Sequence, residues 1–408
     1  MKKLMRTIVF IETNKSGSSR EAIKAAERLG YFTVLFTNRQ KYIQQRTEFP
    51  EVHQMILVEL SNKVELKKNL NELQKQGKQI KGIFSFVHSY VHLAAVLAEE
   101  FCKSVVSTDS ILKMENKVLT RELLKGHPNS PYYALYTPDY PLELFISQAT
   151  DYLPLILKSP ASAGSKDVLL ANNQSQLKVA IQELRKKNEQ ILLEEYLTGP
   201  QYLIEVLVHN GRVHIVAVIE QEITFSKRFI VTGYCLLPYI NQRMYKSIHE
   251  TVSSILRAFE MKNGSCHLEM RLVNGIWKLI EINPRISGGA MNRIIEVGYG
   301  INLVEETIQL MLGNEPRLTR KHSKYVYAHY LTVDSRGKLN RVTGKELATE
   351  FPGVEEVYIK PRQGQIVRPP ISMGDRCGYV LTSSNVKIEA KRMAIRAASQ
   401  VHFYIDPI

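Results

Sequence analysis

The stretch CHLEMRLVNGIWKLIEINPRISGGAMNR, residues 266–293, constrains the fold more than any other part of the 408-residue chain. Polar and apolar residues alternate in both of its halves, a pattern typical of half-buried β-strands. The central Asn274-Gly275 pair is a turn signal, and Gly288-Gly289 marks a second turn. The stretch therefore predicts a β-hairpin that leads into a Gly-Gly turn and then a helix.

The same alternation predicts how the two strands pair. A plain two-residue turn at the centre would place Leu268 opposite Glu281 and mix apolar with acidic residues on one face. A shift of one residue instead pairs Glu269 with Glu281 and His267 with Asn283. Because a one-residue slip turns every side chain to the other face, the apolar pattern selects the shifted register.

The shifted register has two consequences. Its apolar face consists of Leu268, Met270, Leu272, Ile280 and Ile282. Its connection cannot be a plain two-residue turn, so we predict an odd-length loop or a bulge at Asn274-Gly275-Ile276.

The opposite face of the hairpin gathers two carboxylates and one amide oxygen, from Glu269, Glu281 and Asn283. Hard divalent cations bind such oxygens, and Mg²⁺ typically takes one or two carboxylates together with substrate phosphates. Arg285 follows two residues later, where a guanidinium can stabilise a phosphoryl group or a tetrahedral intermediate. For one hairpin alone, a solvated face with a chance pair of acids explains the pattern equally well. Three oxygen ligands, an arginine and a Gly-Gly turn together favour a catalytic metal site.

The motifs HLEMR and IEINPRISGG closely resemble the metal-binding hairpin of ATP-grasp ligases, particularly the carboxylate–amine ligases that join L-amino acids. The resemblance covers nearly the whole chain. It implies a multidomain α/β and α+β protein, with an N-terminal parallel-sheet, Rossmann-like domain, an ATP-grasp fold and a small C-terminal α+β domain. It also implies that ATP activates a carboxylate as an acyl phosphate that an amine attacks, with Mg²⁺ or Mn²⁺ as the metal, and that ADP and phosphate are released.

Composition narrows the classes of partner. The chain carries 54 Lys+Arg against 40 Asp+Glu, a net charge of +14. The basic residues are dispersed and no recognition motif stands out, so anionic small substrates such as ATP, or plain solubility, explain the charge and no nucleic-acid partner is expected. None of the four cysteines forms a C-x-x-C pair, and no apolar run approaches the ~20 residues of a membrane-spanning helix. We expect no membrane association and a cytoplasmic location.

Four domains are predicted along the chain. Residues 1–110 alternate strands with helices, which indicates a parallel sheet covered on both faces. By resemblance, residues 111–190 form the lid subdomain, residues 191–320 the core with the metal hairpin, and residues 321–408 the C-terminal α+β domain. A homodimer through the N-terminal domain is common in the family.

The resemblance also implies which residues bind the phosphates of ATP. Lys117 lies in a predicted helix over residues 109–124, and the family's corresponding lysine contacts a phosphate. Lys158 ends the strand LPLILK, and the small-residue loop 159–167, with Ser165, follows it. In ATP-grasp enzymes such a lysine and loop close over the phosphates. Taken singly, both lysines would be ordinary solvated or snorkelling side chains.

The strand ILLEEYL, residues 191–197, resembles the segment that binds adenine. Glu194 would accept a hydrogen bond from the adenine amino group. The backbone of Glu195, Tyr196 and Leu197 would contact the edge of the ring. Gln201 stands where the family often has an acid for the ribose hydroxyls, and its amide can accept the same bond more weakly. The pair of glutamates alone would be an ordinary charged strand end.

The remaining expectations concern the substrate side of the site. Arg285 would be the catalytic residue, stabilising the acyl phosphate and the tetrahedral intermediate. Ser287 and the Gly288-Gly289 turn would present amides to a phosphate or a carboxylate. His267 either contacts the substrate amine or is a satisfied structural histidine, and His88 either faces a substrate crevice or belongs to a loop or the core.

Two other functions compete with an amino-acid ligase. One is a carboxylating or formate-using ATP-grasp enzyme of biotin or purine metabolism, which the C-terminal domain also suits. The run ISGG after the arginine favours the amino-acid ligases. The other is a nucleotide- or nucleic-acid-binding protein without catalysis, against which the intact set of Glu269, Glu281, Asn283 and Arg285 argues.

Overall fold

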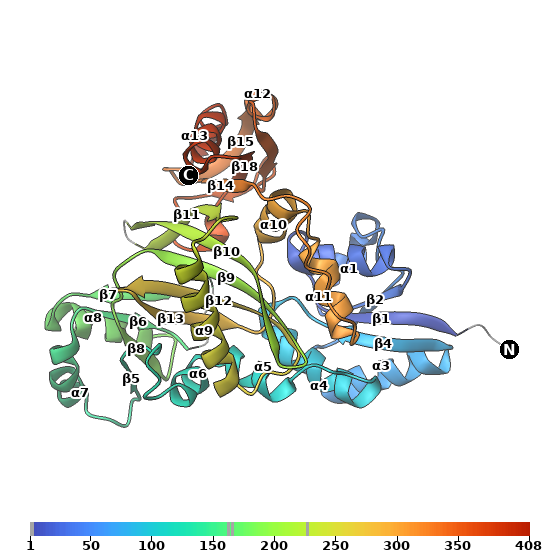
Figure 1. The fold of residues 1–408 in the computed structure, drawn as a ribbon, viewed down its shortest axis with the longest axis horizontal. Helices are drawn as coiled ribbons and strands as arrows, with labels where there is room; N and C mark the ends of the chain where they lie inside the picture. Colours follow the sequence, from blue (N-terminus) through green and yellow to red (C-terminus); the bar gives the residue numbers. More distant parts are fainter. Residues whose placement is uncertain (1–3, 161–163, 165–166, 226–227) are drawn as a thin grey trace.

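The computed structural model describes residues 4–160, 164, 167–225 and 228–408. Its N-terminal region is a parallel sheet of order β3-β2-β1-β4, as the alternation of strands and helices predicted (Figure 1). The elements of this region are β1 (Met5–Ile11), α1 (Ser18–Arg28), β2 (Phe32–Thr37), α2 (Gln40–Gln44), η1 (Arg46–Glu48), β3 (Gln54–Leu57), α3 (Lys63–Lys75), β4 (Lys78–Phe84), η2 (His88–Tyr90) and α4 (Val91–Phe101).

The central strand β1 shows why this sheet is covered on both faces. Ile8 and Phe10 pack with helix α1, whereas Val9 and Ile11 pack on the other face with α3 and α4. All four side chains are buried. A continuous apolar run of this kind is typical of a parallel strand between two layers of helices.

The predicted helix over residues 109–124 is divided into two helices. They are α5 (Thr108–Glu115) and α6 (Lys117–Leu123). Between them the side chain of Asn116 accepts hydrogen bonds from the N–H groups of Val118 and Leu119, the standard role of an N-cap asparagine. This break makes Lys117 the first residue of α6.

The lid subdomain contains an antiparallel sheet of order β5-β8-β6-β7. Its elements are β5 (Tyr133–Tyr136), α7 (Leu142–Ala149), η3 (Thr150–Tyr152), β6 (Leu155–Lys158), β7 (Val168–Ala171), α8 (Gln174–Arg185) and β8 (Ile191–Glu195). Strand β8, which the sequence placed at the start of the core, pairs with β5 and β6 inside this sheet. The sheet therefore ends after Glu195 rather than before residue 191.

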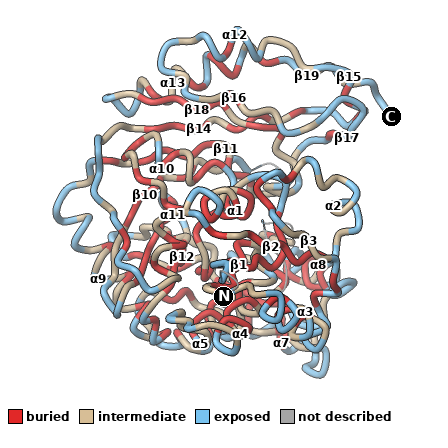
Figure 2. Tube along the Cα trace, turned by 90° about the vertical axis from the view of Figure 1, so that its right-hand side faces the viewer, coloured by how far each residue is buried: buried red, intermediate tan, exposed pale blue. Residues whose placement is uncertain are grey.

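The core is built on an eight-stranded sheet of order β13-β12-β9-β10-β11-β14-β18-β16. The strands and helices of its first part are β9 (Gln201–His209), β10 (Arg212–Phe225), β11 (Phe229–Leu236), α9 (Gln242–Ala258), β12 (Gly264–Val273), β13 (Ile276–Asn283), α10 (Met291–Tyr299) and α11 (Leu303–Met311). Helix α9 packs on one face of this sheet, and α10 and α11 lie on the other face, next to α1. Figure 2 shows the buried interior that these layers share.

The C-terminal region continues the core sheet. Its elements are β14 (Tyr325–Leu331), β15 (Gly337–Thr343), α12 (Lys345–Thr349), β16 (Val354–Ile359), β17 (Ile366–Val367), η4 (Met373–Asp375), β18 (Gly378–Ser384), α13 (Lys387–Ala398) and β19 (His402–Pro407). Strand β14 pairs with β11, so backbone hydrogen bonds cross the predicted boundary at residues 320–321. Strands β15, β17 and β19 form a separate small sheet. Figure 1 shows this region as a lobe above the core.

The metal hairpin has the predicted register but not the predicted turn. Glu269 pairs with Glu281, and His267 pairs with Asn283. The connection is nevertheless a plain two-residue turn, because Val273 pairs with Ile276 and both Asn274 (φ 49°) and Gly275 (φ 83°) are left-handed, as a type I′ turn requires.

The irregularity lies inside the strands, between the pairs Glu269–Glu281 and Met270–Leu279. Ile280 is the extra residue of this β-bulge. The predicted apolar face is therefore wrong at Ile280, which lines the pocket described below, whereas Leu279 and Trp277 take part in the buried core.

Within the described residues, no helix is long and apolar enough to cross a membrane.

Candidate active site

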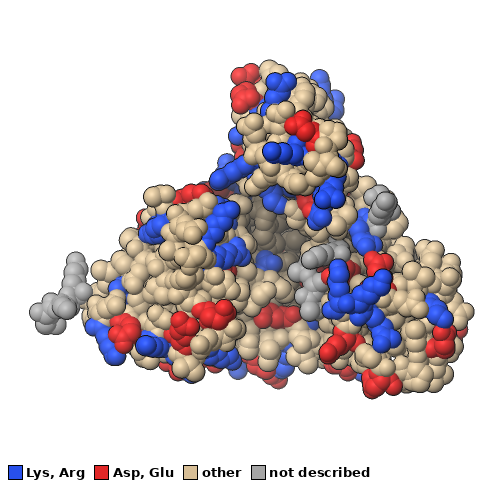
Figure 3. Space-filling view, turned by 180° about the vertical axis from the view of Figure 1, so that it is seen from behind, with Lys and Arg blue, Asp and Glu red and all other residues tan. Residues whose placement is uncertain are grey.

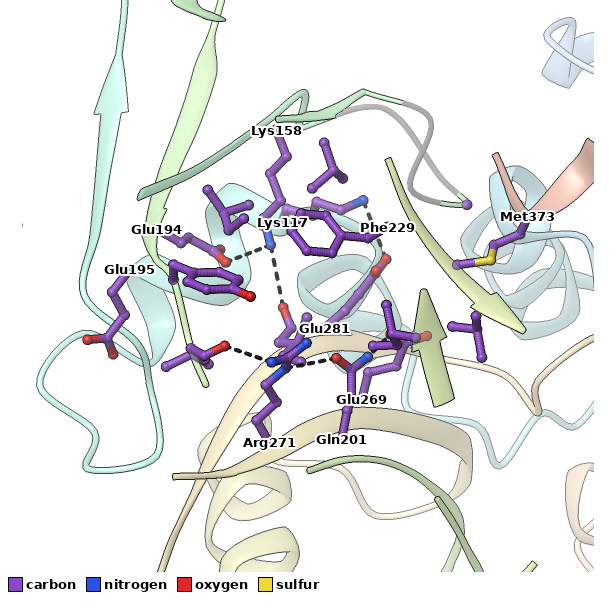
Figure 4. Close-up of a pocket in the computed structure, with 18 of the residues that line it drawn as sticks. Lys117, Lys158, Glu194, Glu195, Gln201, Phe229, Glu269, Arg271, Glu281 and Met373 are labelled. Atoms are coloured by element: carbon purple, nitrogen blue, oxygen red, sulfur yellow. Dashed lines mark hydrogen bonds and ion pairs between the residues drawn. The ribbon is translucent and has the colours of Figure 1, made fainter. Parts of the chain in front are cut away.

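Two facing carboxylates form the centre of the site. Glu269 on β12 and Glu281 on β13 line one pocket between the lid sheet and the core sheet (Figure 4). Burial and the charge of Glu281 raise the pKa of Glu269. Burial would also raise the pKa of Glu281, but the cations of Lys117 and Lys158 outweigh it and lower that pKa. The Lys117 Nζ lies 3.4 Å from the Glu281 Oε1.

The donor set of this face fits a divalent cation. Glu269 and Glu281 are paired across the two strands, and the charge of Glu281 adds to the effect of burial in raising the pKa of Glu269. Asn283 follows on the same strand face as Glu281 and is buried. Two carboxylates and one amide oxygen leave room for phosphate oxygens, as Mg²⁺ prefers. Glu269, Glu281 and Asn283 would hold the ion.

A buried ion-pair network holds the lid lysine in place. The Lys158 Nζ lies 2.7 Å from one oxygen of Glu194, and the Arg121 Nε lies 2.6 Å from the other oxygen. All three side chains are less than one-tenth exposed. Burial favours the uncharged form of Glu194, but the two cations outweigh it and lower its pKa. The network ties α6, the lid strand β6 and the predicted adenine strand β8 together.

The same network reaches the bulge of the metal hairpin. The Arg121 Nη2 donates hydrogen bonds to the carbonyls of Leu279 (3.1 Å) and Ile280 (2.7 Å). The Lys158 Nζ lies 3.5 Å from the Ile280 carbonyl. The bulge thus turns backbone oxygens toward the cations of the lid. Arg121 was not among the predicted site residues, because its partners lie far along the chain.

The predicted adenine segment lines the pocket, but several of its polar groups already have partners. Glu195 and Tyr196 donate their N–H groups to the carbonyls of Tyr132 and Pro154. The Leu197 carbonyl accepts a hydrogen bond from Arg271. These three backbone groups already have partners and are not available to adenine. That this segment contacts the base stays a prediction, and other polar groups of the segment would have to make the hydrogen bonds.

Gln201 lies beside the carboxylates rather than at an open edge of the pocket. Its side-chain oxygen accepts a hydrogen bond from the Arg271 Nε at 3.0 Å. Its amide nitrogen lies 2.7 Å from Gln221 and 3.3 Å from Glu269. Its predicted ribose contact would compete with these bonds. Arg271 and Gln221 were not among the predicted site residues. The one signal for either was the alternation that places Arg271 on the same strand face as His267 and Glu269.

Arg285 and His88 lie next to the metal hairpin. Burial lowers the pKa of His88 to about 4, and the nearby cations of Arg285 and Lys117 add to this effect. The structure therefore brings His88 of η2 and Lys117 of α6 together with Glu281 on β13 and with Arg285 in the bend after β13. The Arg285 guanidinium is largely buried, and its Nε has no protein partner among the described residues.

His267 is held by the backbone. Its Nδ1 lies 2.8 Å from the Arg285 carbonyl, and a carbonyl can only accept, so the Nδ1 carries the proton. Burial and Arg285 lower the pKa of His267 to about 3. It is thus a neutral histidine with a structural bond that orients the Arg285 backbone, and only its Nε2 remains for a substrate.

The predicted role of Ser287 is not supported, because both of its donors are already used. The N–H and hydroxyl of Ser287 donate to the same oxygen of Glu205, a fully buried residue of β9. Gly288 and Gly289 remain exposed, next to the Gly17-Ser18 turn of the N-terminal region. Glu205 was missed, although an acid inside the apolar run YLIEVLV was a signal for it.

Glu205 makes the stability of the protein depend on pH. Burial raises its pKa from the ordinary 4.5 to about 7, and its second oxygen has no hydrogen-bond partner among the described residues. Between these values the unfolded chain has lost a proton that the folded chain keeps, so stability falls as the pH rises. Glu205→Gln should therefore raise the free energy of unfolding at pH 8 by about 1–3 kcal/mol.

Denaturant unfolding at pH 4.5, 6 and 8 measures this effect. The variant's advantage should be small at pH 4.5, where the folded wild type keeps the proton and the unfolded chain has lost only about half of it, and should grow toward pH 8. Glu99→Gln, a change at an exposed position of α4, is the matched control and should follow the wild type. An equal effect of Glu205→Gln at all three pH values would show that its charge is not the cause.

A second, larger cavity adjoins the pocket. It has a volume of about 660 Å³ and lies among the Ser16-Gly17 loop, the turn at Gly289 and the strands β14, β16 and β18. Met373 lines both spaces, so they meet at this residue. The Met373 N–H also donates to the carbonyl of Gly164, 3.2 Å away in the phosphate loop. The predicted phosphate ligand Ser165 lies outside the described residues.

The arrangement of a two-carboxylate hairpin, a lysine-bearing lid sheet and a parallel N-terminal sheet defines an ATP-grasp protein. Three family models match: an ATP-grasp N-terminal domain over residues 23–101, an ATP-grasp domain over residues 152–293, and an L-amino acid ligase C-terminal domain 2 over residues 329–406. The chain belongs to the ATP-grasp superfamily, and within it the C-terminal domain is that of the L-amino acid ligases.

Individual relatives agree with this assignment. The protein y4rH of Sinorhizobium fredii is 23% identical, over 99% of this chain and 84% of its own length. The L-arginine-specific L-amino acid ligase of Bacillus subtilis is 22% identical, over 52% of this chain and 54% of its own length. The crystal structure of an L-amino acid ligase from Bacillus licheniformis superposes with a TM-score of 0.82 at 19% identity, covering 99% of this chain and 100% of that one. Ligases of this superfamily form C–N bonds, release ADP, and use ATP with Mg²⁺.

Proposed function

We propose that this protein is an ATP-dependent carboxylate–amine ligase that joins two L-amino acids, or an amino acid and another amine, through an acyl phosphate. The observation that carries the proposal is that the pocket with the two carboxylates adjoins a second cavity at Met373. The pocket with Lys158, Glu269 and Glu281 would take ATP, and the 660 Å³ cavity beyond Met373 has the size of a site for small organic substrates.

In the first step, a carboxylate oxygen of the donor amino acid attacks the γ-phosphorus of ATP. The bond between the γ-phosphorus and the bridging oxygen breaks, and ADP leaves. Lys158, fixed by Glu194, would balance the charge that gathers on the phosphate oxygens. Lys117 would act in the same pocket, beside Glu281.

A bound Mg²⁺ supplies charge neutralisation for the phosphate oxygens. The chain's own part is to hold Glu269 and Glu281 face to face, and the bulge at Ile280 helps by anchoring β13 to Arg121. The lid sheet lies over the pocket with Ile156 and Val168, and such an apolar cover excludes water that would hydrolyse an acyl phosphate.

In the second step, the amine nitrogen of the acceptor attacks the acyl carbon. The C–O bond to phosphate breaks, phosphate leaves, and the nitrogen loses a proton to solvent. Arg285 would stabilise the negative oxygen of the tetrahedral intermediate, because its guanidinium is held beside His88 and Glu281 at the edge of the site. The backbone amides of Gly288 and Gly289 would add hydrogen-bond donors there. Ser287 would not contribute, because its donors bind Glu205.

The test is phosphate release from ATP and Mg²⁺ across a matrix of L-amino acids, tried singly and in pairs. Release that requires a particular pair, together with a peptide-bonded product by mass spectrometry, would support the proposal and identify the substrates. Bicarbonate-dependent ADP release without amino acids would instead support a carboxylating enzyme. The match of residues 329–406 to the L-amino acid ligase C-terminal domain favours the first outcome.

A nucleic-acid partner is not part of the proposal. On the face seen in Figure 3, acidic and basic side chains are interspersed rather than gathered into one basic stripe. Mixed charge on this face suits small anionic substrates better than a polymer. Salt-sensitive retention of the protein on DNA, without ATP hydrolysis, would contradict this part.

A further inference from the structure

The second cavity contains one arginine that has no acidic partner. Three arginines line this cavity. Arg28 pairs with Glu305, and Arg293 pairs with Glu296 and Glu356. Among the described residues, no carboxylate lies within ion-pair distance of the third, Arg376.

Arg376 is nevertheless held firmly. Its guanidinium carbon lies 3.6 Å from the centre of the Tyr330 ring. Its Nη1 donates to the Val231 carbonyl at 3.0 Å, and its Nε donates to the Met373 carbonyl at 3.1 Å. A planar cation that is stacked on an aromatic ring and fixed by two carbonyls is already ordered. It therefore loses little further entropy when it binds a ligand.

The position of this guanidinium is the junction of the two spaces. Val231 and Met373, which accept its hydrogen bonds, both line the ATP pocket, whereas Arg376 itself lines the second cavity. The Arg376 guanidinium carbon also lies 5.9 Å from the centre of the Tyr234 ring, and Val231 and Met373 share their pocket with Glu269 and Glu281. Arg376 is thus near the carboxylates but on the substrate side of them. Figure 3 shows the hollow beneath the C-terminal lobe.

An ordered arginine that lines the second cavity, with no carboxylate beside it among the described residues, is suited to bind an anion there. The donor's carboxylate is the reacting group, so it must lie at the γ-phosphate, on the side of Glu269 and Glu281. A further, unreacted carboxylate would need a cation of its own. We propose that Arg376 binds the α-carboxylate of the acceptor, so that the acceptor is an amino acid with a free carboxylate rather than a simple amine.

This inference rests on the proposed ligase function, but binding can test it without turnover. The protein is loaded with Mg²⁺ and a non-hydrolysable ATP analogue. Its melting temperature is measured with an equimolar mixture of the standard L-amino acids and, separately, with a mixture of their carboxamides. The wild type should be stabilised by the acids more than by the amides. Arg376→Met, which keeps the aliphatic stem, should lose the part of this difference that comes from the acceptor and should keep the part that comes from the donor.

Turnover then measures the size of the effect. With the pair found in the matrix, replacing the acceptor by its carboxamide should raise its KM about 10- to 100-fold in the wild type, the usual loss for one charge-assisted hydrogen bond. Arg376→Met should raise the KM for the acid by the same factor, and leave the KM values for the amide and for ATP within about twofold. Arg376→Lys should restore part of the preference, because it keeps the charge without the planar fork.

Arg362→Met is the matched control, since Arg362 is an exposed arginine of the same lobe outside the cavity. The inference is overturned if Arg376→Met keeps the full preference of the wild type for acids over amides, or if neither mixture stabilises the wild type. Stabilisation by the acids with no phosphate release from any pair would contradict the proposed ligase reaction and leave Arg376 as a carboxylate-binding residue.

Discussion

Arg285→Ala should abolish turnover while ATP still binds. The guanidinium lies largely buried beside Glu281 and His88, where it would meet the charge that develops in both proposed transfers rather than the adenine or ribose. Removal of an arginine that acts on a phosphoryl transition state typically costs about 10³–10⁵-fold in kcat. The measurement is kcat for phosphate release with the best amino-acid pair, together with the Kd of a fluorescent ATP analogue.

Two further variants define the role of this arginine. Arg285→Lys keeps the charge and should recover a small part of the activity. Arg257→Ala, at an exposed position at the end of α9, is the control and should leave kcat within about twofold. If Arg285→Ala lost nucleotide binding together with turnover, the residue would act on the bound nucleotide and not on the transition state.

Glu281→Gln should remove most of the response to Mg²⁺. The change deletes one of two facing carboxylates and keeps the shape of the side chain. With only Glu269 left, half-saturation by Mg²⁺ should rise at least about 10- to 100-fold, since even outer residues of metal sites change affinity by this factor. Activity at saturating ATP would be followed as a function of Mg²⁺, and then of Mn²⁺.

The loss of a negative charge next to Lys117 and Lys158 should also change the binding of ATP in the absence of metal. Binding of ATP in the presence of EDTA should be as strong as in the wild type or stronger, because the two lysines are then less neutralised. Glu315→Gln, at an exposed position after α11, should behave as the wild type in both assays. Unchanged Mg²⁺ dependence in Glu281→Gln would remove Glu281 from the metal site.

The hairpin shows what alternation in a sequence can and cannot determine. It predicted the pairs Glu269–Glu281 and His267–Asn283, because only this parity keeps acids and apolar residues on separate faces. It did not locate the irregularity, since one extra residue at the turn or within a strand produces the same parity. The bulge lies at Ile280, where its carbonyl is bound by Arg121, a contact that no local pattern contains.

Residues that act through distant partners were the ones that the sequence did not predict. Arg121 meets Glu194 across 73 positions, and Glu205 meets Ser287 across 82. Each is a single charged residue in an apolar or helical context, with no spacing that marks it. Lys117, Lys158 and the hairpin acids were predicted because they belong to short motifs. Their convergence on one pocket needed the structure.

The pairing of β11 with β14 has a consequence for any attempt to divide the chain. The matched L-amino acid ligase domain begins at residue 329, within β14. A cut there would divide β14: Val326 to Ala328 would stay paired with β11 but lose their partners on β18, and β18 would lose the same pairs in the C-terminal piece. Each piece would then carry an open strand edge. Open edges of this kind pair with other chains. The two pieces made separately should therefore aggregate, and should be recovered in solution together when they are co-expressed.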